Sequence, residues 1–160
     1  MSGRMIEEVK FVNPLPTGAA MDDLYEGGFS TDIVNLSNYE RATWVIARGV
    51  GATGTANITV DSCDTTAPGT STAIPFVYAV ASSGDTLGAM TAATAAGYTT
   101  ATGAGSMVVV EINSSELSGT NKFARLTITE GADSPVSGSV VCIMSNPRII
   151  AGTSAPTAIV

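Results

Sequence analysis

The chain has 160 residues, which suits a single domain with a hydrophobic core. Hydrophobic residues make up 44% of it and charged residues only 13%, with small neutral Ser, Thr and Gly in the place of charge. The net charge is −7 and the seven basic residues are scattered, so we expect no direct binding to nucleic acid or to an anionic membrane surface.

The first 28 residues show no sustained period of two or 3.6, and they contain several prolines and glycines. Ordering such a segment costs about 1–2 kcal/mol per residue in backbone entropy, so its apolar side chains need something to dock on. We predict an N-terminal arm, residues 1–28, that lies across a neighbouring subunit; the alternative is a segment packed on its own domain. Its apolar candidates for contact are Phe11, Leu15, Met21, Leu24 and Tyr25.

From Phe29 onward the pattern predicts strands. Residues 56–61 alternate with Ile58 and Val60 on one face, and residues 124–129 do so with Leu126 and Ile128. Further strands are predicted at 43–48, 74–80, 107–112 and 136–144. The last two are nearly continuous apolar runs, which predicts central strands covered on both faces. Glycine-rich turns separate these strands, so we expect an all-β, antiparallel β-sandwich or jelly-roll-like domain over residues 29–150, followed by a C-terminal tail, 151–160.

Residues 85–105 are rich in Ala, Thr and Gly. Only residues 87–96 could be helical, and their length and threonine content make a helix marginal. We interpret 85–105 as a long loop or a poorly specified sheet edge.

The chain offers little to catalysis. Histidine is absent, which removes the most common general base and transition-metal ligand, and no P-loop is present. Asp61 and Asp64 are too few carboxylates for a calcium site. We therefore expect no enzymatic activity, no metal and no cofactor.

Single residues fit a cytoplasmic, structural protein. Glutamates stand near the N-terminus where a signal peptide would be apolar, and no run reaches the ~20 apolar residues of a membrane helix. Cys142 is interpreted as a small buried hydrophobe, although a disulfide with Cys63 stays open if their strands are adjacent. Trp44 is expected in the core rather than as a sugar-stacking platform. Arg148 is a candidate for a salt bridge to a neighbouring subunit, with a local carboxylate as the alternative partner.

Residues 56–78, which read ANITVDSCDTTAPGTSTAIPFVY, are followed by strands at 108–112 and 123–128 and by a closing strand that ends at 145–148. This order and spacing resemble the head decoration (cement) proteins of tailed bacteriophages, over about residues 29–150. The N-terminal arm and the Ala/Thr-rich loop have no counterpart in the resemblance.

The resemblance implies a β-sandwich or jelly-roll-like domain that binds the outside of an icosahedral shell and stabilises it. Its partners would be the major capsid protein and itself, as a homotrimer more often than a homodimer. The protein would be made in the host bacterial cytoplasm and end on the outer capsid surface of the virion. The candidate subunit or capsid contacts are then Phe11, Leu15, Met21, Leu24, Tyr25 and Arg148.

Two alternatives stay open. One is a phage head-fibre, spike or tail-associated binding module that contacts host-surface glycans, for which the loop-like aromatic candidates are Tyr25, Tyr39 and Tyr98. The other is an enzyme of unfamiliar type with converging carboxylates, for which the sequence offers no pair.

Overall fold

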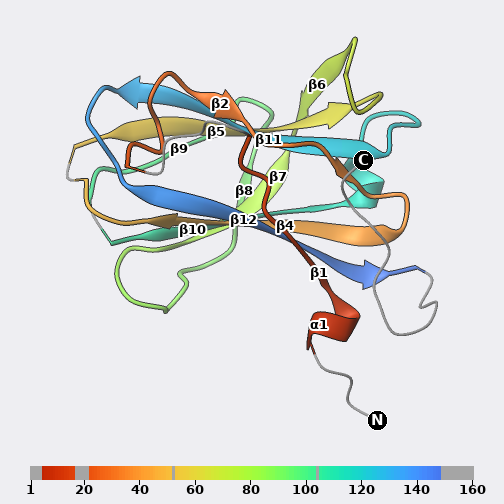
Figure 1. Cartoon of the computed structure of the whole chain (residues 1–160), viewed down its shortest axis with the longest axis horizontal. Helices are drawn as coiled ribbons and strands as arrows, with labels where there is room; N and C mark the ends of the chain where they lie inside the picture. The colour runs from red at the N-terminus through yellow and green to blue at the C-terminus, as the bar shows by residue number, and fades with distance from the viewer. Residues whose placement is uncertain (1–4, 17–21, 52, 104, 149–160) are drawn as a thin grey trace.

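The computed structural model describes residues 5–16, 22–51, 53–103 and 105–148. These residues form two antiparallel sheets that pack face to face, the upper and lower layers of Figure 1. The predicted all-β antiparallel sandwich is confirmed. Met21 and the predicted C-terminal tail, 151–160, lie outside the described residues.

The lower layer, sheet A, brings together strands from both ends of the chain. In spatial order it contains β1 (Lys10–Val12), β12 (Gly138–Pro147), β4 (Tyr39–Arg48), β10 (Met107–Asn113), β7 (Phe76–Ala81) and β8 (Thr91–Ala93). Every neighbouring pair is antiparallel.

The upper layer, sheet B, is built around a long pair of strands from the middle and the end of the chain. It contains β2 (Phe29–Ser30), β11 (Phe123–Ala132), β5 (Thr55–Cys63) and β6 (Ser71–Ile74), with β3 (Val34–Asn35) beside β11 and β9 (Tyr98–Thr99) beside β5. Outside the sheets lie α1 (Met5–Glu8) and a 3-10 turn, η1 (Ser114–Glu116).

The core lies between the two sheets and follows from the alternation of the strands. Ile58 and Val60 of β5 and Leu126 and Ile128 of β11 point inward and are buried, as predicted. They belong to one apolar cluster with Trp44 of β4, whose exposed fraction is 0%. Trp44 is therefore a core residue.

The predicted strand at 74–80 is confirmed from residue 76 onward, but residue 74 belongs to a different strand. β6 ends at Ile74 in sheet B and β7 begins at Phe76 in sheet A, with Pro75 between them. Proline has no N–H to donate to a strand ladder, so pairing is interrupted at this residue and the chain passes from one sheet to the other.

The described residues of 85–105 are mostly loop with two short strands and no helix, which agrees with the interpretation as a loop or sheet edge. β8 pairs with β7 at the edge of sheet A, and β9 then pairs with β5 in sheet B. The segment therefore connects the two sheets along one side of the sandwich. The Tyr98 ring stacks on the Tyr78 ring with their centroids 4.1 Å apart, which packs this connection against the core.

The described part of residues 1–28 lies on its own sandwich, which is the alternative to an arm on a neighbouring subunit. β1 pairs with β12 along Lys10↔Met144 to Val12↔Cys142, and Leu24 and Tyr25 are fully buried. Their burial supplies the free energy that orders the segment. Only α1 leaves the sandwich, and Figure 1 shows it below sheet A, on the side away from sheet B.

Candidate interaction surface on sheet A

The outer face of sheet B is polar, as expected for a face in contact with water. Its central residues are Asn57, Thr59 and Asp61 on β5, opposite Thr129, Thr127 and Arg125 on β11. Arg125 Nε lies 3.2 Å from the Asp61 carboxylate, and both side chains are partly exposed. A polar face of this kind is stable in contact with water.

The middle of the outer face of sheet A is apolar, and the polar Arg41, Asn113 and Ser145 lie on the same face toward one end of the strands. Strand register places four small or β-branched residues side by side across four strands, since residues directly opposite each other share a face. This central row runs from β12 to β7 as Val141, Val45, Val109 and Ala79. Val141 is 39% exposed. The row therefore presents aliphatic side chains to the outside of the sandwich.

A second row lies beside the first and holds the only charge in the two rows. From β1 to β8 it contains Phe11, Ile143, Thr43, Glu111, Val77 and Ala92. The Glu111 carboxylate accepts a hydrogen bond from Thr43 Oγ1 at 3.1 Å and lies 3.4 Å from Arg41 Nε. The charge of Glu111 is thus compensated within the chain.

The prediction that the strands at 107–112 and 136–144 are covered on both faces is wrong for the single chain. Both strands have neighbours on either side in sheet A, but only their inner face meets sheet B. The outward residues of β10 alternate with buried ones as half-buried positions, and those of β12 include the exposed Val141. The apolar residues at outward positions of these two strands are therefore the sequence feature that indicates an interaction surface.

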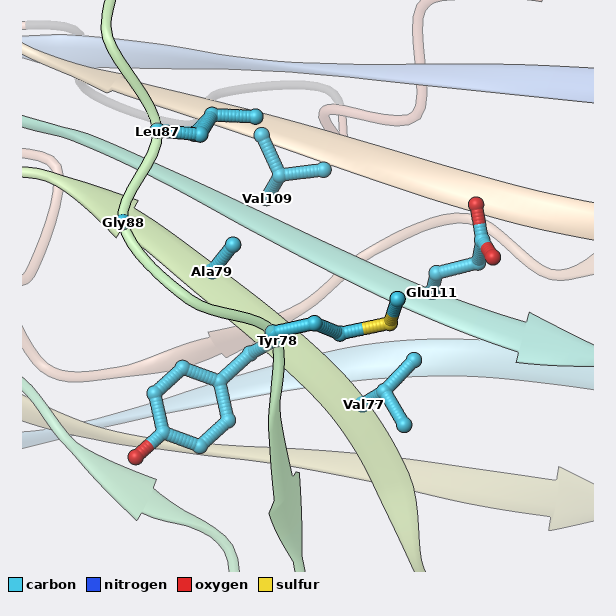
Figure 2. Close-up of a pocket in the computed structure, with 8 residues that line it drawn as sticks. Val77, Tyr78, Ala79, Leu87, Gly88, Val109 and Glu111 are labelled. Carbon is cyan, nitrogen blue, oxygen red and sulfur yellow. The ribbon is translucent and has the colours of Figure 1, made fainter.

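Two apolar grooves flank the central row. The first has a volume of about 260 Å³ and lies over β7 and β10, as Figure 2 shows. Leu87 points from the loop after β7 toward Val109, whereas Tyr78 points away from the other labelled side chains. Leu87 is 43% exposed and Met90, in the same lining, is 71% exposed. The loop therefore raises two large apolar side chains at this side of the face.

The second groove, of about 350 Å³, lies at the opposite edge of sheet A from the first, beside β12 and the end of β1. Phe11, Leu15 and Val141 are among its lining residues. Four of the six large hydrophobic residues that are exposed in the described chain line one of these two grooves: Phe11, Leu87, Met90 and Val141.

The contact residues expected from the sequence fall into three groups. Phe11 is 46% exposed and Leu15 is partly buried, and both lie at the second groove. Leu24 and Tyr25 are buried in the core of their own chain, so their side chains are not exposed for contact with another subunit. Met21 lies outside the described residues.

Arg148 is exposed at the end of the sandwich. Its guanidinium donates to Ser114 Oγ at 2.6 Å, and its backbone N–H donates to the Asn38 carbonyl at 2.9 Å. The local partner of its side chain is thus a hydroxyl group, where the sequence suggested a carboxylate.

The cysteines do not pair. Cys63 on β5 and Cys142 on β12 are free, buried and in different sheets. Burial raises the pKa of both thiols, which keeps them protonated and unreactive at neutral pH. Within the described residues, no three His, Cys, Asp or Glu side chains come together as a metal site.

The three tyrosines considered for glycan stacking are not exposed platforms. Tyr25 and Tyr39 have exposed fractions of 0%, and Tyr98 is half-buried against Tyr78. Sequence alone places these residues near turns but does not reveal that their rings turn inward.

The described helices include none that is long and apolar enough to cross a membrane. Comparisons with protein-family models, curated proteins and solved structures found no match to this chain. The fold and the face define a β-sandwich domain with one polar and one apolar outer surface.

Proposed function

We propose that this chain is a structural virion protein that decorates the outer surface of a bacteriophage capsid and stabilises it by bridging major capsid subunits. The observation that carries the proposal is the broad apolar face of sheet A, with its charge-compensated rows and two grooves. A face of this kind suits a protein that acts through protein contacts. The order and spacing of the strands, which resemble those of head decoration proteins, supply the particular partner.

The protein would stabilise the shell by thermodynamic linkage between its own binding and shell assembly. A protein that binds only the assembled shell lowers the free energy of the shell by the free energy of binding. Contacts that are individually weak suffice, because each bound molecule that spans two shell subunits binds the second with a high effective concentration. The low content of charged residues, 13%, suits close packing on a lattice.

The glycan-binding alternative is less well supported. A glycan site uses aromatic rings that are open to solvent, whereas Tyr25, Tyr39 and Trp44 are each 0% exposed. The two grooves on sheet A are lined mainly by aliphatic side chains and offer few polar groups to orient sugar hydroxyls.

The test is the copy number of this protein on purified native particles, measured against the major shell protein. Decoration predicts a ratio near one or a simple fraction, and removal of the protein without opening of the shell. Particles stripped in this way should release their genome at a lower temperature, and added protein should restore the original temperature. A few copies per particle would instead indicate a spike, fibre or tail component, and absence from particles would reject the proposal.

A further inference from the structure

The outer face of sheet A has the properties of a strand surface that is buried in the assembled protein. β10 and β12 carry apolar residues on both faces, a pattern typical of strands covered on two sides. Sheet B covers the inner side only. We propose that the outer side is covered by the same face of a second copy of this chain, packed sheet on sheet about a two-fold axis.

The direction of the axis follows from the order of the strands. Sheet A has its midline between β4 and β10. Rotation about an axis that runs along the strands at this midline places β4 over β10 of the second copy, β12 over β7 and β1 over β8. This rotation does not shift residues along the strand direction, so each row of one copy lies over the same row of the second copy. Such an isologous contact is closed with two copies.

The residues that come to face each other are complementary in size. In the central row, Val141 lies opposite Ala79 of the second copy, and Val45 lies opposite Val109. At the next level Met107 faces Ala47. A larger side chain meets an alanine in the first and third of these contacts, and two valines of equal size meet in the second, so the two sheets can approach to the ~10 Å of a packed sandwich.

The grooves are complementary in the same arrangement. The loop with Leu87 and Met90 stands over the β7 side of the face, and the groove beside Phe11 and Val141 lies at the β12 side. The two-fold axis brings the loop of each copy to the groove of the other. The contact is made twice, and it buries four exposed hydrophobic residues from each chain.

Charge and area also fit a second copy. Each chain carries −7, yet Glu111 in the facing rows is balanced by Arg41, so two copies meet there without an uncompensated carboxylate. The six strands contain 39 residues, which at about 3.4 Å per residue and about 4.8 Å between strands cover a projected area of roughly 600 Å². The accessible surface of projecting side chains exceeds its projection, and stable interfaces bury ~800 Å² per partner.

This pairing goes beyond capsid decoration and does not depend on it. It assigns the apolar face of sheet A to a second copy, so a decorating pair would contact the shell through its other surfaces. A pair presents every other surface twice, which is what the bridging of two equivalent shell subunits requires. The resemblance to decoration proteins implies three copies more often than two, whereas the geometry of this face points to two.

The test uses one charge on each side of the proposed contact, Val141→Lys and Leu87→Glu. Both residues are exposed in the single chain, 39% and 43%, so neither change disturbs the core. Leu87 points toward Val109 on β10, which lies two strand spacings, roughly 10 Å, from β12, so the two new charges are not direct neighbours within one chain. In the proposed pair, each Lys at 141 meets a Glu at 87 of the second copy. Thr129→Lys, on the exposed outer face of sheet B, is the matched control.

We expect the native protein and the Thr129→Lys control to sediment with twice the 16.1 kDa mass of one chain. Each single change on sheet A should give the mass of one chain, and the double variant should regain the mass of two and lose it again at high salt. A native protein with the mass of one or three chains, single variants that stay paired, or a double variant that stays single would each overturn the pair.

Particle binding is measured on the same variants, so that the two proposals can fail separately. Val141→Lys protein that keeps its native mass but no longer binds shells would show that the shell covers this face, which overturns the pair and leaves decoration standing. Native protein that pairs in solution through this face but is absent from particles would leave the pair standing and reject decoration.

Discussion

The guanidinium carbon of Arg48 lies 5.7 Å from the centre of the Tyr25 ring, and this contact fastens the N-terminal segment to one end of sheet A. Arg48 is only 6% exposed. Its guanidinium also donates to the carbonyl oxygens of Ala101 at 2.9 Å and Gly54 at 3.5 Å. One buried cation thus holds two loops and the N-terminal segment together.

Arg48→Met should lower the free energy of unfolding by about 2–4 kcal/mol, because it leaves the buried Gly54 carbonyl and the partly buried Ala101 carbonyl without this donor and removes the cation–π contact. Urea unfolding followed by the fluorescence of Trp44, the one tryptophan of the chain, measures this loss. Lys122→Met, at an exposed lysine, is the control and should change stability by less than about 0.5 kcal/mol. Equal effects of the two changes would show that the Arg48 contacts contribute nothing.

Deletion of residues 1–28 should abolish cooperative folding. It removes the edge strand β1 and the buried side chains of Val12, Leu24 and Tyr25. Each large apolar side chain contributes about 1.5–3 kcal/mol by burial, against a total stability of ~5–15 kcal/mol for a domain. Circular dichroism at increasing temperature measures the result. Deletion of residues 1–8, which leaves β1 in place, is the control and should keep a cooperative transition. An unchanged melting temperature in the longer deletion, with loss of assembly, would restore the arm on a neighbouring subunit.

Strand alternation made much of the fold predictable, because a period of two with β-branched residues has few other solutions. Residues 56–61 and 124–129 are the clearest cases, and they form the central pair of sheet B. Pairing between distant segments was not predictable in this way. Pro75 signals an interruption of pairing within 74–80 but not a change of sheet, and nothing in residues 1–28 indicates that β1 completes an edge of sheet A.

The candidate surface was only partly predictable from sequence. Phe11 and Leu15 were expected contacts and lie at a groove on sheet A. Val45 and Val109 were missed, because an apolar residue in a strand gives no indication of whether a second sheet covers it. Register settles the question, since it shows which apolar residues share the outer face and that one chain has no layer to cover them.

The free energy of unfolding should fall at alkaline pH, and the cysteine thiols should be the first groups to contribute to this fall. Burial raises the pKa of the Cys142 thiol, so the folded chain retains a proton that the unfolded chain releases above pH ~8.5. The contribution of this thiol is therefore complete below pH ~8.5 and is lost as pH rises, with a slope of at most about 1.4 kcal/mol per pH unit. Burial raises the pKa of Tyr25 in the same direction, from a higher starting value of 10.0.

The measurement is the free energy of unfolding in urea between pH 7 and pH 10. Cys142→Ala should be less stable than the native chain at pH 7, because it loses a buried sulfur, but its stability should fall less steeply above pH ~8.5. Parallel curves for the two proteins would contradict a folded-state shift at Cys142.

Gly97 lies in the turn between β8 and β9 that joins the two sheets, and Gly84, in the loop after β7, is its matched control. Both have positive φ, +92° and +69°, so alanine at either site costs about 1–2 kcal/mol in backbone strain. They differ in their surroundings. A Cβ at Gly97 would lie 2.5 Å from the Ile58 carbonyl oxygen and 2.8 Å from Thr59 Cγ2, whereas a Cβ at Gly84 would meet nothing within 4 Å.

Gly97→Ala should therefore cost about 1–3 kcal/mol more than Gly84→Ala, because overpacking adds to the strain and moves β9 away from β5. Urea unfolding gives both values. Hydrogen exchange adds a local readout, since the Thr100 amide donates to the Ala56 carbonyl at 2.8 Å beside this turn and should lose protection only in Gly97→Ala. If both variants lost the same stability and kept this protection, the turn at Gly97 would not be held against β5.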